Sequence, residues 1–524
     1  MTTSPLSRSS NWFILFILLL ALGGLLRLLD ITDPPLDFQP SRQLRNSLVA
    51  RDIYYSLLPT ATTEQRNLAS SFARSVGQYE PPVMESIVAV TYLFTGGENF
   101  SSARIWVTLF WLVAGIALFD LARRAVSPWA GLLALAYYFV LPFSVQASRS
   151  FQPDPLMTSA FVVGIYFLYR WSEASGVQEL APASDSTHTS FRRSFGRASE
   201  LSDSRKETWK WAILAGIFLG LATFVKIVIA FFAGAAAIAL VLFTLKKDFW
   251  KSKQVWVMAA LMIVPALIFY ILLNQGRSTE YFFAWTVTLI KLITSTDFYS
   301  KWLAFIGSLF GLTTIFLSIA GTLIATPRLR WLLISLWIGY IFYGLMLPFQ
   351  MYTHSYYHIQ LIPIIALGLA VALNPLIESV AAQSQVGRVS FITLIVAVIG
   401  YQSWVARSVL VAEDFHHESV FWKQVGDVIP ADADVIALTQ DYGYRLMYFG
   451  WRKVTLWPYV TELAEVRNGE VDFADRFDEL TAGRDYFLVT AFGQLDQQPS
   501  LKKILDEYPI AIQGDGYVLY DLNK

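Results

Sequence analysis

Eleven long apolar runs constrain what this chain can fold into. A helix that crosses the hydrocarbon core of a bilayer needs about 20 mostly apolar residues. Runs of this kind occupy residues 11–29, 104–121, 128–145, 154–171, 210–225, 227–245, 254–274, 302–324, 329–349, 358–375 and 389–408. Charged residues make up only 15% of the chain, against roughly 25% in soluble domains. The sequence therefore predicts a mainly α, polytopic membrane protein with about eleven transmembrane helices.

The first run, residues 11–29, invites comparison with a secretory signal peptide. Its apolar part is long, its basic region is only Arg8, and no small-residue cleavage site follows it. A signal peptide has a shorter apolar core and such a cleavage site. A retained first helix is favoured.

Basic residues in alternate loops predict the orientation in the membrane. One set of loops holds Arg123 and Arg124, the lysines between 246 and 253, and Arg328 with Arg330. Cytoplasmic loops are enriched in Lys and Arg. We therefore expect a multi-pass protein of the plasma (inner) membrane with a cytoplasmic N-terminus and an extracytoplasmic C-terminal domain. The parity depends on the break at Lys226, which alone separates two apolar runs.

The polar stretches predict the domain organisation. Residues 1–409 are expected to form the transmembrane module, and residues 410–524 a small soluble α/β domain. The predicted segments of that domain are strands at 435–438, 486–489 and 516–520 and helices at 420–428 and 501–508. Within the transmembrane module, residues 30–103 read as a first external loop with amphipathic helices at 42–58 and 84–94. Residues 173–209 are predicted to be a disordered cytoplasmic loop, and 276–300 an interfacial or re-entrant segment.

Charge and cysteine content exclude several classes of function. The 40 basic and 40 acidic residues cancel, which does not suggest a nucleic-acid partner. The chain has no cysteine, which excludes disulfides, thiolate metal sites and thiol nucleophiles.

Asp37 is the first candidate catalytic residue. It follows a Pro-Pro turn after the first helix, and Arg42, Arg45 and Arg51 come after it. Nearby positive charge favours the ionised carboxylate, which can act as a general base. The alternative is that Asp37 caps the helix that begins near Ser41.

Three further charged residues follow in the predicted external loops. Glu80 precedes a second Pro-Pro step, which restricts the backbone around it; alone it also fits a solvated loop acid. Arg149 and Asp154 share a very short loop on the same side as Asp37. Asp154 also fits the N-cap of the next helix, with Pro155 as its first residue.

Lys226 stands among apolar residues in GLATFVKIVIAFF, at the external end of a helical pair. Charge at such a depth is costly, so the ammonium is expected either to meet an anion or to extend to the headgroups.

A cluster of His and Tyr follows the ninth apolar run. His354, Tyr356, Tyr357 and His358 lie within five residues, and the two histidines are four apart. Metal ligation competes with anion binding and interfacial placement. No HExxH motif or local carboxylate accompanies the pair, so the latter two are favoured.

These candidates converge on one side of the membrane from different loops. A channel favours polar rings within the helices, and a secondary transporter favours mid-helix charges and repeated halves. The sequence shows no clear internal repeat. An enzyme site at the external interface fits the pattern better.

Five motifs in order resemble a known family. They are Arg27 with Asp37, Arg42-Gln43 and Arg51; Glu80-Pro81-Pro82 with Phe94, Gly96, Gly97 and Arg104; Arg123-Arg124 with Pro142, Arg149 and Pro153-Asp154; Gly220-Leu221-Ala222 before Lys226; and Tyr357 before Leu361-Ile362-Pro363. Across roughly residues 11–375 the chain resembles the GT-C membrane glycosyltransferases of the protein O-mannosyltransferase and aminoarabinose-transferase type. It departs from many relatives in having Phe38, not a second acid, after Asp37.

The resemblance implies an inverting glycosyltransferase that uses a polyprenyl-phosphate monosaccharide and an acceptor hydroxyl on a protein, a lipid or a cell-wall glycan. It implies Asp37 as general base and Asp154 as its support or as an acceptor-positioning group. Lys226, Arg42, Arg149, His354 and His358 are the expected phosphate-side residues, with Glu80 and Tyr357 as further substrate contacts. A divalent cation such as Mg²⁺ or Mn²⁺ is compatible with the family, but no dedicated metal cage is expected. A lipid-linked-sugar flippase and a non-catalytic scaffold are the alternatives, and Phe38 favours the scaffold.

Overall fold

The computed structural model describes residues 9–77, 79–180, 191–274, 289–381, 383–460 and 476–523. Its contacts divide it into two compact units. The first unit comprises residues 1–31, 78–84 and 103–412, and the second comprises 32–77, 85–102 and 413–524. The predicted first external loop thus groups largely with the C-terminal domain.

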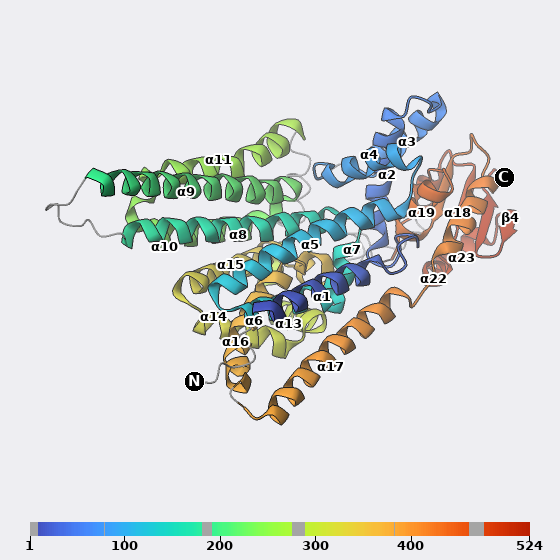
Figure 1. Ribbon diagram of the computed structural model, residues 1–524. Coiled ribbons are helices and arrows are strands. Elements are labelled where there is room, and N and C mark those ends of the chain that lie inside the picture. The colour runs from blue at the N-terminus through green and yellow to red at the C-terminus, as the bar shows by residue number, and fades with distance from the viewer. Residues whose placement is uncertain are drawn as a thin grey trace. The chain divides into compact units, whose positions relative to one another are not determined.

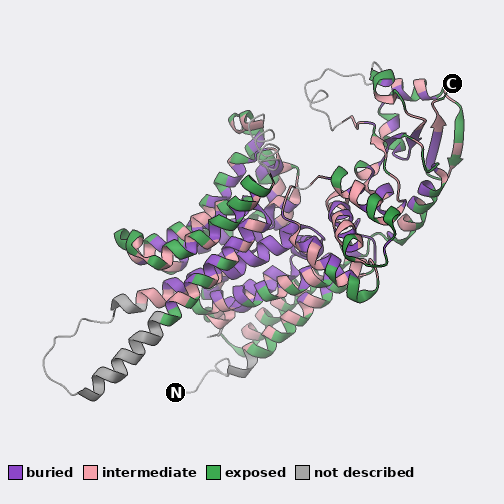
Figure 2. Ribbon diagram, turned by 90° about the horizontal axis from the view of Figure 1, so that it is seen from above, coloured by how far each residue is buried: buried purple, intermediate pink, exposed green. Residues whose placement is uncertain are grey.

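The first unit is a bundle of helices. Its elements are α1 (Ser9–Leu28), α5 (Phe100–Ala125), α6 (Pro128–Val140), α7 (Pro142–Arg149), α8 (Pro153–Leu180), α9 (Phe191–Val225), η2 (Ile227–Ile229), α10 (Ala230–Leu245), η3 (Lys246–Lys251), α11 (Lys253–Leu267), η4 (Ile268–Leu273), η5 (Ile290–Thr294), α13 (Thr296–Phe310), α14 (Leu312–Ile324), α15 (Pro327–Met346), η6 (Gln350–Tyr352), η7 (Ser355–His358), α16 (Leu361–Ala381) and α17 (Gln385–Leu410). Helices α8, α9 and α11 run side by side (Figure 1). Buried positions follow the inner faces of the bundle (Figure 2). Large apolar side chains such as Leu25 and Ile238 are exposed. An outer surface of this kind requires lipid around it.

Seven helices are long and apolar enough to cross a membrane among the described residues, and nine cross if each of two bent pairs counts as one span. The multi-pass, mainly α class is confirmed. Two of the eleven predicted spans are not among these nine. One coincides with α1, whose described apolar part is shorter, and the other with α8, which carries more polar side chains. The number eleven stays a prediction.

The two bends have local causes. Helices α6 and α7 meet at 64° where Leu141 precedes Pro142, and the residue before a proline is driven out of the helical region. Helices α13 and α14 meet at 93° around Gly311, whose φ is 79°, a conformation that glycine adopts without penalty. Elsewhere glycine allows close packing: a methyl group on Gly321 would overlap the carbonyl oxygen of Gly368 across α14 and α16.

The predicted disordered loop at 173–209 is helical where it is described. Helix α8 continues to Leu180 and α9 begins at Phe191, while residues 181–190 lie outside the described ranges. Pairs such as Arg170 with Glu173 at 3.3 Å support helix in this charged sequence. Of the predicted interfacial segment 276–300, residues 276–288 also lie outside the described part.

The second unit joins the first loop to an α/β domain. Its elements are α2 (Pro40–Leu57), α3 (Thr63–Ser75), α4 (Val83–Thr95), α18 (His416–Val428), β1 (Val435–Leu438), η8 (Gln440–Gly443), α19 (Tyr444–Phe449), β2 (Thr455–Leu456), α21 (Phe477–Thr481), β3 (Tyr486–Val489), α22 (Phe492–Asp496), α23 (Pro499–Leu505), β4 (Ile510–Gly514) and β5 (Tyr517–Asp521). The sheet order is β2-β1-β3-β5-β4, with β2, β1 and β3 parallel and β5 antiparallel to both neighbours. The predicted α/β domain is confirmed.

Two apolar cores cover the faces of this sheet, and a third involves the loop. Successive side chains on a strand point to opposite faces, so Ile436 joins one core and Val435 the other. The third core packs Leu44, Leu48 and Phe72 of α2 and α3 against Met447 and Tyr448 of α19. This core explains why the first loop belongs to the second unit.

Candidate active site

A buried ion pair forms the centre of the site in the first unit. The Lys226 Nζ lies 2.7 Å from the Asp154 Oδ1, and the two residues are 5% and 2% exposed. Lys226 has extended backbone angles (φ −154°, ψ 114°) between the end of α9 and η2. Asp154 lies in the first turn of α8, where the partial positive charge of a helix N-terminus favours a carboxylate. Of the two alternatives predicted for Lys226, an anion or the headgroups, the structure supplies an anion, the Asp154 carboxylate.

Two tyrosine rings enclose the ammonium group. The Lys226 Nζ lies 5.0 Å from the centre of the Tyr356 ring and 4.9 Å from that of Tyr357. The Tyr357 ring in turn stacks on Tyr343, with 6.2 Å between the centres. Ring faces attract cations, so the two rings favour this position of the ammonium group beside Asp154. His354 packs edge-on against both tyrosines, at 5.5 and 5.9 Å.

Glu80 lies in the same unit and connects to this region through Tyr270. The Glu80 carboxylate is close enough to interact electrostatically with Tyr270. The Tyr270 hydroxyl donates to the Phe224 carbonyl at 3.3 Å, two residues before Lys226. The structure therefore brings together Asp154, Lys226 and Tyr357, with His354 beside them.

His358 is held in a separate, fully buried network. Its Nε2 lies 3.1 Å from the Met351 carbonyl oxygen, which can only accept, so Nε2 carries the proton. Its Nδ1 then accepts from the Tyr340 hydroxyl at 2.9 Å. Burial lowers the His358 pKa from 6.5 to about 3. The geometry supports a neutral, structural imidazole, which is not suited to binding a phosphate.

Acid is expected to destabilise the fold through His358. The unfolded histidine binds a proton below pH 6.5 and the folded one only near pH 3, so this contribution to stability is complete above pH 6.5 and is lost as pH falls towards 3. At pH 5 the loss is about 2 kcal/mol. Urea unfolding at pH 7.5 and 5.0 measures it. The His358→Asn variant should lose less between the two pH values than the wild type, and His417→Gln, at an exposed histidine, should lose as much as the wild type. Equal losses in His358→Asn and wild type would contradict the assignment.

Arg149, the last residue of α7, contacts the backbone that follows α1. Its guanidinium donates to the Asp30 carbonyl at 3.1 Å, and Arg104 donates to the carbonyls of Asp30 and Ile31 at 3.0 and 3.1 Å. Both arginines are buried. They fix the backbone where α1 passes into the loop that carries Asp37.

Asp37 and Arg42 belong to the second unit. The Asp37 Oδ1 accepts a hydrogen bond from Gln43 Nε2 at 3.3 Å, and the same amide donates to the Phe38 carbonyl at 2.7 Å. Gln39, with φ 51°, reverses the chain between Asp37 and α2. The half-buried Asp37 therefore precedes α2 and does not act as its cap, since the residue at the cap position is Gln39.

One group of side chains in the second unit has ligand geometry for a metal ion. Ligand atoms of Asp33, Asp414 and His416 lie within 4.8 Å of one another. The His416 Nδ1 is 2.6 Å from Asp414 and 3.3 Å from Asp33. Hydrogen bonds from the backbone and ring of His416 lower the Asp414 pKa. The Phe415 N–H also donates to the Asp33 carboxylate at 2.9 Å. The three side chains therefore also fit a purely structural role, in which they connect the loop after α1 to the start of α18.

Arg51 ties the first loop to the α/β domain inside the second unit. Its Nε lies 3.0 Å from both Glu98 carboxylate oxygens, and its Nη1 donates to the Tyr448 carbonyl at 2.8 Å. The guanidinium lies 4.1 Å from the centre of the Tyr448 ring and 4.3 Å from that of Trp451. Arg51 is thus a structural arginine at the junction of α2 and α19.

Arg51→Ala is expected to lower the free energy of unfolding by about 3 kcal/mol, because it leaves Glu98 without its partner in a mostly buried site. Arg51→Lys should recover only part of this, since an ammonium cannot reproduce the planar contacts. Lys423→Ala is a control that breaks an exposed ion pair to Asp427, and it should cost under about 1 kcal/mol. Urea unfolding of the purified variants gives the comparison, and an Arg51→Ala loss equal to that of the control would refute the role.

A family model described as dolichyl-phosphate-mannose-protein mannosyltransferase matches residues 79–181, a stretch that includes Glu80, Arg149 and Asp154. ArnT from Cupriavidus metallidurans, solved bound to undecaprenyl phosphate, aligns with a TM-score of 0.58 at 14% identity over 98% of each chain. The archaeal oligosaccharyltransferase AglB from Archaeoglobus fulgidus, in complex with an inhibitory peptide and a dolichol-phosphate, aligns with a TM-score of 0.54 at 11% identity over 98% of this chain and 74% of its own. The chain has the GT-C fold. No curated protein matches the sequence.

The fold that the five motifs predicted is thereby confirmed. Within the GT-C bundle, sequence reasoning missed two buried amides, Gln152 and Gln360, which are 0% and 1% exposed. Gln152 lies two residues before Asp154, and Gln360 lies near the Tyr343 hydroxyl. The sequence signal that could have identified them is a polar amide next to a predicted apolar run, Gln152 in SFQPDP and Gln360 in YYHIQLIP.

Proposed function

We propose that this protein is an inverting glycosyltransferase that moves a sugar from a polyprenyl-phosphate-linked monosaccharide to an acceptor hydroxyl on the extracytoplasmic side. The observation that carries the proposal is the GT-C fold, shared over 98% of both chains with a protein solved bound to undecaprenyl phosphate. The buried Lys226–Asp154 pair and its tyrosines supply an electrostatic centre within that fold.

Asp37 is the proposed general base. It takes the proton from the acceptor hydroxyl as that oxygen attacks the anomeric carbon, while the bond from that carbon to the phosphate oxygen breaks. A positioned base contributes about 10²–10⁴-fold. The hydrogen bond from Gln43 to Asp37 supports this role because it orients the carboxylate before α2.

Lys226 is the proposed cation for the leaving polyprenyl phosphate, and Arg42, Arg149 and His354 are secondary candidates. Fixed cations in a water-poor site stabilise developing negative charge strongly. Asp154 positions the ammonium at 2.7 Å, and Tyr357 and Glu80 complete the proposed substrate-binding set. The Arg149 guanidinium also donates to the Asp30 carbonyl just after α1, at 3.1 Å.

The proposed orientation has the N-terminus in the cytoplasm and the α/β domain outside. Arg123 and Arg124 lie in the last turn of α5, and Arg328 and Arg330 lie in the first two turns of α15. The Lys226 site lies at the other end of α15, because η7 follows that helix. Basic residues near helix ends favour the cytoplasmic side.

A transfer assay tests the proposed reaction. Purified protein is mixed with radiolabelled polyprenyl-phosphate monosaccharides and crude cell envelope. Label entering a macromolecule with the wild type, and not with Asp37→Asn, supports the enzyme, and the labelled band begins to identify the acceptor. If no donor is used and the protein instead moves lipid-linked sugar across liposome membranes, the flippase alternative replaces the proposal.

A further inference from the structure

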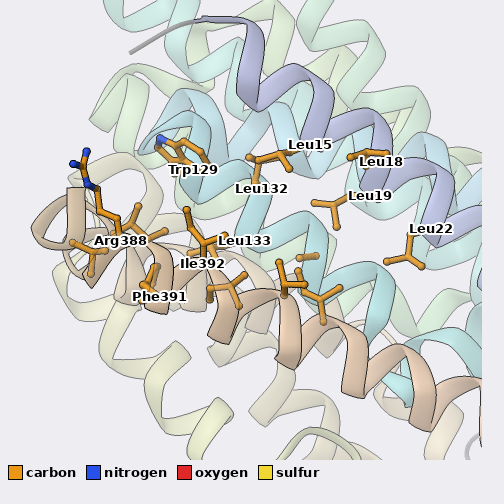
Figure 3. Close-up of a pocket in the computed structure, with 16 residues that line it drawn as sticks. Leu15, Leu18, Leu19, Leu22, Trp129, Leu132, Leu133, Arg388, Phe391 and Ile392 are labelled. Carbon is orange, nitrogen blue, oxygen red and sulfur yellow. The ribbon is translucent and has the colours of Figure 1, made fainter. Parts of the chain in front are cut away.

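A long apolar cavity separates α17 from the rest of the helical bundle. It has a volume of about 380 Å³ and lies between α1, α6, α16 and α17 (Figure 3). All four helices belong to the first unit. Helix α17 packs loosely there, since only 6% of its most apolar 18-residue stretch is buried. A space of this size with apolar walls excludes water and is suited to hydrocarbon.

The cavity has one charged wall residue, at one end. Its lining is otherwise composed of Leu, Ile, Val, Ala, Phe and Trp side chains, and the single charge is Arg388. Figure 3 shows Arg388, Phe391 and Trp129 towards one end and Leu22 at the other. Tryptophan and arginine together mark the headgroup level of a bilayer. The cavity therefore offers an anion site at one end and a hydrocarbon slot beyond it.

The surroundings of Arg388 favour an external anion. Among the described residues, no carboxylate forms an ion pair with its guanidinium within 4.0 Å. The nearest acid along α16, Glu378, accepts a hydrogen bond from Asn374 Nδ2 at 2.8 Å. Asn374 in turn is bound to Ser127 through its Oδ1 at 2.5 Å.

The length of the slot matches one leaflet. The lining of α17 runs from Arg388 to Ile399, which at about 1.5 Å per residue is roughly 16 Å. The hydrocarbon core of a bilayer is about 30 Å thick, so the slot covers about half of it. One acyl chain of a phospholipid fills such a slot, whereas a long polyprenyl chain would extend well past its end.

The slot lies in the leaflet opposite the Lys226 site. Tyr356 and Tyr357, which contact Lys226, precede α16. Arg388 follows α16 after that helix has crossed the membrane once. The anion site at Arg388 is therefore separate from the phosphate site proposed for the sugar donor.

We propose that this cavity binds one acyl chain of an anionic glycerophospholipid whose phosphate contacts Arg388. The lipid fills the space between α17 and the bundle. Because α17 leads directly to the residues of the second unit, the bound lipid holds the transmembrane segment that carries that domain. The proposal does not depend on the sugar-transfer reaction.

Native mass spectrometry of the full-length protein tests the proposal. Delipidated protein receives phosphatidylglycerol, phosphatidylcholine or undecaprenyl phosphate at matched concentrations. We expect one phosphatidylglycerol per protein, retained at activation energies that strip phosphatidylcholine. Arg388→Gln should weaken phosphatidylglycerol binding about tenfold, as loss of a charge-assisted hydrogen bond does. Arg407→Gln, at the other end of the same helix and outside the cavity, should leave it unchanged.

A second variant tests the hydrocarbon slot without touching the charge. Ile395→Trp places a larger side chain in the cavity and should reduce phosphatidylglycerol retention with Arg388 intact. Three results would overturn the proposal. They are equal retention of phosphatidylcholine, an Arg407→Gln loss as large as that of Arg388→Gln, and displacement of phosphatidylglycerol by undecaprenyl phosphate. A lipid-free dimer of the chain would also overturn it, because a second copy would then cover α17.

Discussion

Asp37→Asn is expected to reduce sugar transfer by about 10²–10⁴-fold while the protein remains folded in the membrane. Asparagine keeps the shape of the side chain and an oxygen that can accept from Gln43 Nε2, which lies 3.3 Å from Asp37 Oδ1. It cannot take a proton from the acceptor hydroxyl. The loss should therefore appear in kcat, with no change in the urea midpoint.

Glu64→Gln is the matched control for Asp37→Asn. Glu64 is an exposed acid in the first turn of α3, in the same unit as Asp37. Its replacement removes a negative charge from that unit without reaching the proposed site, and transfer should stay within about twofold of wild type. Full activity in Asp37→Asn, or an equal loss in both variants, would remove Asp37 as the base.

The second large effect is expected at the buried pair. Lys226→Met leaves the Asp154 carboxylate buried without its cation, which costs about 3–5 kcal/mol of stability. Asp154→Leu leaves the ammonium in the same position and should cost a similar amount. The double variant Lys226→Met with Asp154→Leu removes both charges and should recover most of the stability, because a thioether also packs well against Tyr356 and Tyr357.

Activity should not recover with stability in that double variant. If Lys226 contacts the leaving phosphate, transfer falls roughly 10²–10³-fold in kcat/KM for the donor, although the urea midpoint returns towards wild type. Acceptor affinity should change little. A stable double variant with normal donor kinetics would show that the pair serves the fold alone.

The membrane helices could be predicted from the sequence because the bilayer imposes a local rule. Each crossing needs a run of apolar residues, and runs such as 104–121 and 389–408 correspond to α5 and α17. The central strands β1 and β3 were predicted at their observed bounds for a related reason, since parallel strands buried on both faces are continuous apolar runs. Strand β4 was missed because it is largely exposed, and β2 because it has only two residues.

The site was predictable in its residue types and not in its pairings. Lys226 stands out in sequence because charge among apolar residues is costly, but its partner is 72 residues away along the chain. His354 and His358 are equivalent in the sequence, at spacing four. Only tertiary packing shows that His358 is buried between Tyr340 and Met351 while His354 lies against Tyr356 and Tyr357.

The amino-acid sequence by itself determined the number and order of apolar segments, the α/β character of the C-terminal region and the charged residues that a membrane protein would not carry without cause. The tertiary structure alone decided that Asp154 neutralises Lys226, that the first loop packs with the C-terminal domain through Arg51, and that α17 leaves an apolar slot beside the bundle. The physical reason is the distance along the chain over which each kind of interaction acts. Apolar runs and turn residues act over a few neighbours, whereas ion pairs, shared cores and cavities depend on segments that meet only after the chain has folded.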